Sequence, residues 1–375
     1  MPIPRLRTQA ITDENALPDR VRKGRGAVSN RLSGRFDAPD RYESVDEWSQ
    51  VDWGEDDEPQ QVRTILGVDT ARKIISYNQS PDVGFNRSIN PYKGCEHGCI
   101  YCFARPTHAY LDLSPGLDFE TRIFRKPDAA KLLRQELSHP KYVPGRLALG
   151  INTDAYQPTE RTEKLTRALL EVLSEFNHPV HIVTKSALIL RDLDLLAPMA
   201  ARGLFSATLS ITTLDRHLSR VMEPRAATPQ KRLDTVRALK AAGIPISVLA
   251  APMIPGLTDH ELEAIVKAAA EAGAERVGYS LVRLPHEIRL LFEDWLRLNF
   301  PDRADKVLNH IRQCRDGKLN DAHFGSRMRG TGPFAELMAQ RFALAIKRHG
   351  LDGPRPRIEP APFKGGNPQM SLFSD

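Results

Sequence analysis

Segments with the pattern of a strand and segments with the pattern of a helix alternate six times between residues 88 and 298. The strands are largely apolar and the connections are short, as in parallel sheets whose faces are covered by helices. Because six repeats are too few to close an eight-stranded barrel, the pattern predicts an α/β fold, a partial (β/α)6 barrel of the TIM type. The predicted strands are 88–92, 146–152, 180–184, 204–211, 245–254 and 276–284, and the helices that follow them are 127–137, 162–177, 188–202, 228–242, 258–272 and 286–298.

The pattern divides the chain into four predicted parts. Residues 1–60 show no sustained helical or strand period and form an extended, partly disordered arm, residues 61–300 the barrel, residues 301–350 a helical extension and residues 351–375 a flexible tail. The arm is basic and rich in glycine and serine over residues 20–41, then acidic over residues 43–58. It is either a solvated, loosely ordered segment or an arm that contacts phosphate groups.

Three of the four cysteines, Cys95, Cys99 and Cys102, follow the first predicted strand in the spacing C-x3-C-x2-C. Three thiols so close together cannot all form disulfides, so the spacing predicts a metal centre. Zinc would take a fourth ligand, which His97 or His108 could supply. An iron–sulfur cluster is favoured by thiolate ligation, and one of its irons would remain open to a substrate or cofactor.

The residues that flank the three cysteines resemble those of a known family. The triplet has Tyr101 at its aromatic position, N-P-Y-x-G-C upstream and Y-C-F-A-R downstream. It resembles the radical SAM superfamily, and within it the spore photoproduct lyase-like branch, whose members are often called DNA repair photolyases. The resemblance implies an enzyme with a 4Fe-4S cluster whose fourth iron is chelated by S-adenosylmethionine. The reduced cluster would cleave this cofactor to a 5'-deoxyadenosyl radical, which abstracts hydrogen from substrate. It also implies an electron donor of the flavodoxin or ferredoxin type.

Polar residues just past each strand of such a barrel are expected to meet at its mouth. After the second strand, Asp154 is our candidate acceptor for the cofactor's ammonium group, with Glu160 as the alternative acceptor. The alternative role of Asp154 is a helix cap. Lys185 would bind the cofactor's carboxylate and Ser186 a ribose hydroxyl. The resemblance implies that four further residues contact the ribose or adenine of the cofactor: Tyr101, Ser210, Met253 and Tyr279. The alternative is that such residues serve only in the strands and core.

Two arginines after strands four and six, Arg225 and Arg283, could clamp a carboxylate or phosphate of the substrate; the alternative is a surface ion pair. A Gly/Arg loop at residues 325–332 is either a third anion site or a flexible turn. The chain has no cysteine between Cys102 and Cys314. Spore photoproduct lyases are thought to return the hydrogen through a barrel cysteine, so repair of the spore thymine lesion itself is in doubt. Cys314 is expected to be a buried, inert thiol.

The composition bears on partners and location. The chain has 375 residues, a net charge of +6 and a pI near 9.1, which permit a polyanionic partner such as DNA. It has no apolar run of about 18 residues and no apolar signal core near its start, so we expect a cytoplasmic protein without a membrane partner.

The tail is rich in proline from residue 354 onward and ends in a short apolar motif. The motif resembles the Q-L-S/D-L-F pentapeptide with which bacterial replication and repair proteins bind the DNA sliding clamp. Leu372 and Phe373 would be its apolar anchors, with Gln369 and Met370 before them.

We therefore predict a radical SAM enzyme that acts on nucleic acid, in DNA repair or modification. A second hypothesis is a radical SAM enzyme that acts on a peptide or small metabolite. A third is a non-catalytic iron–sulfur or zinc protein that binds DNA or a partner.

Overall fold

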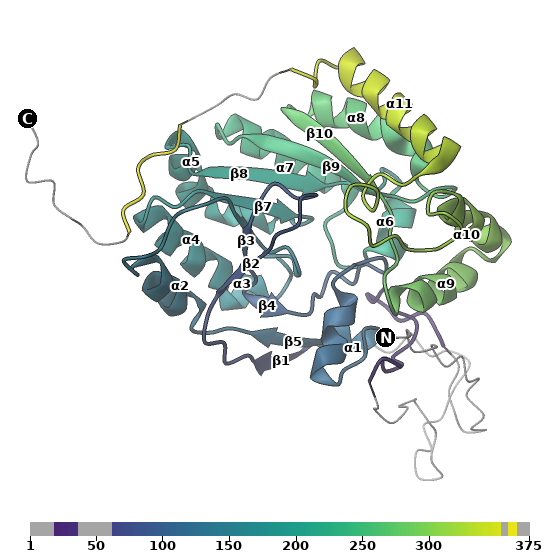
Figure 1. The fold of residues 1–375 in the computed structure, drawn as a ribbon, viewed down its shortest axis with the longest axis horizontal. Helices are drawn as coiled ribbons and strands as arrows, with labels where there is room; N and C mark the ends of the chain where they lie inside the picture. Colours follow the sequence, from purple (N-terminus) through teal and green to yellow (C-terminus); the bar gives the residue numbers. More distant parts are fainter. Residues whose placement is uncertain (1–18, 37–61, 354–358, 366–375) are drawn as a thin grey trace, which may run out of the picture.

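The computed structural model describes residues 19–36, 62–353 and 359–365. Among these residues, a sheet of seven strands forms the centre of the fold (Figure 1). Its spatial order is β2 (Ile75–Tyr77), β3 (Arg87–Ile89), β6 (Leu147–Leu149), β7 (Val180–Thr184), β8 (Phe205–Ser210), β9 (Ile246–Met253) and β10 (Arg276–Leu281). The strands from β3 to β10 are parallel, and β2 is antiparallel to β3. Because β2 and β10 remain edges, the barrel is open, which confirms the predicted partial (β/α)6 barrel.

Helices cover the outer face of this sheet, as the alternation of β8 illustrates. Phe205, Ala207 and Leu209 belong to the main apolar core, whereas Ser206 and Ser210 lie between them on the opposite face. The covering helices are α2 (Ala129–Leu137), α4 (Leu165–Glu175), α5 (Leu193–Ala201), α7 (Pro229–Ala241) and α8 (Leu262–Glu271). Beyond the barrel come α9 (Ile288–Asn299), α10 (Ala304–Gln313) and α11 (Gly332–Arg348), of which α11 packs beside α8 and β10 (Figure 1).

Every predicted barrel helix is present, but three begin with a separate turn. Lys164 has a left-handed φ of 52° and divides α3 (Glu160–Glu163) from α4. A 3-10 turn precedes α5 at Ala187–Asp192, and another precedes α8 at Asp259–Glu261. None of the helices in the described part of the chain is long and apolar enough to span a bilayer.

The predicted first strand, 88–92, is divided between two sheets. β3 ends at Ile89, and β4 (Tyr92–Lys93) pairs instead with β5 (Arg122–Arg125) in a small sheet that also contains β1 (Ile65–Val68). α1 (Leu117–Thr121) leads directly into β5. The small sheet and α1 therefore frame the loop that carries the three cysteines.

Residues 19–36 have neither helix nor strand, but they pack closely on this region. Arg22 and Arg25 are buried, as are Ala27 and Val28. In this described part, Arg22 donates to the carbonyl of Val28 and Arg25 to that of Glu120, so these two arginines are engaged within the protein. The division into arm, barrel, extension and tail stays a prediction.

Candidate metal and cofactor site

The three predicted metal ligands lie on one loop between β4 and the 3-10 helix η1 (Arg105–Leu111). Cys95 and Cys99 are buried and Cys102 is partly exposed. The Cys95 amide donates to Phe119 of α1 at 2.9 Å, and the Cys102 amide to Cys99 at 3.2 Å. Burial raises the pKa of Cys95 and of Cys99, so these thiols would ionise only when a positive charge such as a metal binds them.

A buried ion pair holds the backbone of this loop. The side chains of Arg105 and Glu120 are both fully buried and hydrogen-bonded to each other. Arg105 also donates to the carbonyl of Cys99 at 2.9 Å and to that of Gly98 at 3.1 Å. These bonds satisfy carbonyls that would otherwise be buried without partners. The Arg105 in the Y-C-F-A-R run thus fixes the path of the cysteine loop.

The N-terminal segment also contacts the Arg105–Glu120 pair, which was not predicted from the sequence. The Glu120 carboxylate accepts from the amides of Gly26 at 2.9 Å and Ala27 at 2.8 Å. A Cβ on Gly26 would lie 1.9 Å from the carbonyl oxygen of Gly98, so only glycine allows this approach. The repeated glycines of K-G-R-G-A, residues 23–27, were the only sequence signal that could have pointed to it.

Asp154 lies beside the cysteine loop, and its carboxylate is bonded to other groups of the protein. It accepts from Tyr156 N at 2.9 Å, Thr184 Oγ1 at 2.6 Å and Lys185 N at 2.8 Å, and lies 3.3 Å from Nδ1 of His97. Burial alone would raise the pKa of Asp154, but these contacts outweigh it and lower the pKa to about 2. Asp154 thus has a positioning role that was not predicted from the sequence: its carboxylate ties the cysteine loop to the ends of β6 and β7.

Lys185 and Ser186 follow β7 at the barrel mouth. The Lys185 ammonium lies 5.8 Å from the ring centroid of Tyr101 and close enough to Cys99 to favour its thiolate. Among the described residues it forms no ion pair, which leaves its charge available to an anion. The Ser186 hydroxyl accepts from the amide of Leu188 at 3.2 Å and begins the next turn.

A second buried network joins the cysteine loop to β8 and α7. Glu223 accepts from the hydroxyls of Tyr101 and Thr212 and forms a buried ion pair with Arg232. Arg232 also donates to the carbonyl of Ser210 at 2.9 Å. Tyr101 and Ser210 were predicted from the sequence as site residues, whereas Glu223 and Arg232 were not. Their residue types carry no periodic signal, so only the fold reveals them.

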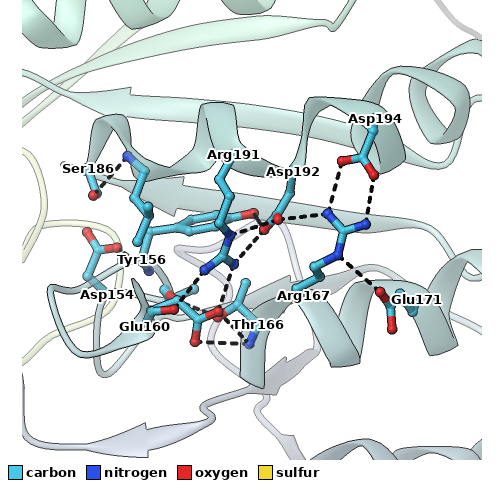
Figure 2. A network of polar contacts seen from close by, with 12 residues as sticks. Asp154, Tyr156, Glu160, Thr166, Arg167, Glu171, Ser186, Arg191, Asp192 and Asp194 are labelled. Atoms are coloured by element: carbon cyan, nitrogen blue, oxygen red, sulfur yellow. Dashed lines mark hydrogen bonds and ion pairs between the residues drawn. The ribbon is translucent and has the colours of Figure 1, made fainter. Parts of the chain in front are cut away.

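Other candidates lie away from the loop. Tyr279 packs against Phe342 of α11 on the helix-covered face of β10, with ring centroids 4.6 Å apart and the rings tilted by 47°. Met253 is fully buried in the main core. Both positions favour the alternative of core residues over cofactor contact. Glu160 is fully buried and paired with Arg191 in the network of Figure 2, which also contains Asp192. This network stabilises the turn before α4 and gives Glu160 a structural role.

The two predicted substrate arginines differ. Arg225 pairs with Glu96 of the cysteine loop at 3.2 Å, and its amide donates to His97 O at 3.3 Å. The predicted alternative of an ion pair therefore describes Arg225 in this structure. Arg283 forms no ion pair with any described residue and stacks instead on Phe103, 5.3 Å from its centroid. Gln369, Met370, Leu372 and Phe373 lie outside the described residues, so clamp binding stays a prediction.

The two histidines predicted as a possible fourth zinc ligand both have other partners. Within residues 19–36, 62–353 and 359–365, no three His, Cys, Asp or Glu side chains converge as ligands of a single ion would. His97 faces Asp154, and Nε2 of His108 bonds the carbonyl of Arg122 at 2.9 Å. A four-iron cluster instead takes each thiolate on a different iron, which suits three cysteines spread along one loop.

Comparison with known proteins identifies the superfamily. Residues 89–269 match the family described as "Radical SAM superfamily". The uncharacterized protein Rv2578c of Mycobacterium tuberculosis is 39% identical over 231 residues, which cover 61% of this chain and 68% of that protein. The uncharacterized protein MJ0683 of Methanocaldococcus jannaschii is 30% identical over 191 residues, which cover 51% of this chain and 68% of the relative.

Solved structures with a similar fold include spore photoproduct lyase complexed with dinucleoside spore photoproduct. It has a TM-score of 0.53 and 16% identity, and the match covers 76% of this chain and 78% of that one. A mutant of the lyase with bound AdoMet and the same dinucleoside matches with a TM-score of 0.53 and 17% identity. The superfamily implies a 4Fe-4S cluster and S-adenosylmethionine, and the three thiols on one loop fit that cluster. The chain belongs to the radical SAM superfamily and is an enzyme of that class.

Proposed function

We propose that this enzyme acts on nucleic acid, in DNA repair or modification, with a 4Fe-4S cluster held by Cys95, Cys99 and Cys102. The observation that carries the proposal is the buried three-thiol loop at the mouth of an open parallel barrel. Barrels of this kind carry their chemistry at the C-terminal ends of the strands. When bound, the cluster and S-adenosylmethionine supply a radical that removes a hydrogen atom from the substrate.

The side chains of this chain would bind and position. Lys185 would hold the carboxylate of S-adenosylmethionine, because its ammonium is next to Cys99 and lacks an acidic partner among the described residues. Asp154, Glu223 and Arg105 would keep the cysteine loop in place, since each bonds it from a different side. Enzymes of the superfamily also need a reductant, for which we propose a flavodoxin or ferredoxin.

Two observations support a nucleic-acid substrate. The net charge of +6 favours a polyanion, and the fold resembles that of an enzyme solved with a dinucleoside lesion. The sequence has no cysteine between Cys102 and Cys314 that could return a hydrogen atom to the product. We therefore propose a reaction on DNA other than repair of the spore thymine lesion.

The first experiment tests the chemistry. The protein is reconstituted anaerobically with iron and sulfide and reduced with dithionite in the presence of S-adenosylmethionine. We expect release of 5'-deoxyadenosine by the wild type and none by Cys99→Ala. Absence of 5'-deoxyadenosine from wild-type protein with an intact cluster would contradict the proposed activity.

The second experiment tests the substrate. The reaction is run with deuterium-labelled DNA, untreated or irradiated with ultraviolet light, and 5'-deoxyadenosine is analysed by mass spectrometry. We expect deuterium in the 5'-deoxyadenosine, because the abstracted atom comes from DNA. Unlabelled 5'-deoxyadenosine at an undiminished rate would favour the alternative substrates, a peptide or a small metabolite.

A further inference from the structure

An arginine–aromatic pair borders the cysteine loop. Phe103 follows Cys102 directly, so their Cα atoms are about 3.8 Å apart. Its ring is 42% exposed, although a large apolar side chain gains free energy by burial. The guanidinium of Arg283, just past β10, lies over this ring at 5.3 Å from the centroid. The pair therefore offers a flat, charged surface beside the third cysteine.

The charge of Arg283 is not neutralised within the described residues. No described carboxylate lies within ion-pair distance of Arg283. The acid whose charge acts on the pKa of Arg283 is Asp82. Asp82 is itself engaged with Arg327 and the amide of Gly325. Burial, together with the charges of Arg327 and Arg315, lowers the pKa of Arg283. A guanidinium in this position would gain free energy by binding an anion.

A second pair of the same kind joins Arg327 of the Gly/Arg loop to Phe324, which directly precedes that loop. Arg327 lies over the ring of Phe324 at 4.6 Å from the centroid, and Phe324 is 60% exposed. Arg327 donates to Ser80 Oγ at 2.6 Å and to Asp82, and both acceptors precede β3. These bonds join the chain near one edge of the open barrel to a loop that packs at the other edge, where the Leu281 amide at the end of β10 donates to Met328 at 2.9 Å. The Phe324 ring is thus held in place.

We propose that Arg283 binds a backbone phosphate of a nucleic-acid strand, and that Phe103 and Phe324 are stacking surfaces for its unpaired bases. This inference rests on the proposed function and adds the subsite that presents the strand to the cysteine loop. Guanidinium groups bind phosphate oxygens in a bidentate manner, and aromatic rings stack on bases of any sequence. Two aromatic surfaces suit a strand better than a small phosphorylated metabolite, which would occupy only one.

The test measures binding to the reconstituted protein by fluorescence anisotropy, with a labelled single-stranded oligothymidylate and a hairpin duplex of the same length. Arg283→Gln should weaken single-strand binding and reduce the slope of log Kd against log salt concentration by about 0.7, as for one lost phosphate contact. Phe103→Ala should weaken binding roughly 5- to 100-fold without changing the slope, because it removes only stacking.

Arg283→Lys should retain the slope. The control, Arg237→Gln, removes the same charge from the outer helix α7, where Arg237 pairs with Asp234.

The outcomes separate this subsite from the proposed chemistry. Equal effects of Arg283→Gln and Arg237→Gln on affinity and slope would overturn it, as would a duplex that binds with the same dependence on Phe103. So would a wild type that binds inorganic phosphate through Arg283 but no oligonucleotide, the result for a small-metabolite enzyme. Circular dichroism and iron content after reconstitution, expected to match those of the wild type, check that each variant folds. A wild type that binds the strand as described but releases no 5'-deoxyadenosine would support the subsite and contradict the proposed function.

Discussion

A Cβ atom on Gly26 would lie 1.9 Å from the carbonyl oxygen of Gly98, so the N-terminal segment rests directly on the backbone of the cysteine loop. Gly26→Val should therefore displace that loop, destabilise the protein by about 1–3 kcal/mol and lower the iron content after reconstitution. Gly34→Val is the matched control, because no atom lies within 4 Å of its Cβ position. Equal iron content in the two variants would show that the segment does not position the loop.

The cysteines of the loop and the remaining cysteine should differ in metal binding. Cys99→Ala should lose the cluster, whereas Cys314→Ala should retain about four irons per chain. Cys314 is buried near α10, and burial raises its pKa to about 11, as expected of an inert thiol. Iron and sulfide analysis with visible absorption checks both variants. Loss of iron from Cys314→Ala would assign that thiol to the metal site.

The ion pair between Arg232 and Glu223 should contribute strongly to stability. Arg232→Met leaves the Glu223 charge buried without a counter-charge, at a cost of about 3–5 kcal/mol. Glu223→Gln added to Arg232→Met should recover part of this loss, because the neutral amide still accepts from Tyr101. Urea unfolding under argon measures both effects.

The control is Arg237→Met, which breaks an exposed pair on α7 and should cost no more than about 1 kcal/mol. A double variant less stable than Arg232→Met would contradict this account.

His178 should make stability depend on pH. Burial lowers the pKa of His178 to about 4; its Nδ1 bonds the carbonyl of Pro179 and its Nε2 the hydroxyl of Tyr142, as in a neutral imidazole. Between pH 4 and about 6.5 the unfolded chain binds a proton here that the folded chain does not. The free energy of unfolding should therefore rise with pH over this window, by up to about 3 kcal/mol.

His178→Gln should flatten that rise, whereas the exposed His217→Gln should leave it unchanged. Chemical unfolding at several pH values between 4 and 7 gives the slopes. An equal rise in wild type and His178→Gln would assign the pH dependence to other groups.

The tail motif predicts binding to the sliding clamp. Deletion of residues 369–375, or Leu372→Ala with Phe373→Ala, should abolish binding to the clamp of the same organism, because both apolar anchors are lost. Ser374→Ala is the matched control and should bind like the wild type. Surface plasmon resonance measures the interaction, and unchanged binding after the deletion would refute the motif.

The sequence alone determined the barrel and the loop that carries the three cysteines. Strands and helices have apolar periods of 2 and 3.6 residues, so their alternation can be recognised from the sequence. The three cysteines lie within eight residues, so their clustering is visible without knowledge of any tertiary contact. Lys185 was likewise predictable, because it directly follows a strand whose end must face the barrel mouth.

Only the tertiary structure decided which polar groups meet. Gly26 and Glu120 are 94 positions apart, and a bond between an amide and a carboxylate has no periodic signature. For Tyr279 the sequence left cofactor contact and a core role open, because successive strand residues face opposite ways and only the packing of α11 fixes which side is covered. The stacking of Arg283 on Phe103 is of the same kind, since distant segments become neighbours only when the sheet curves into an open barrel.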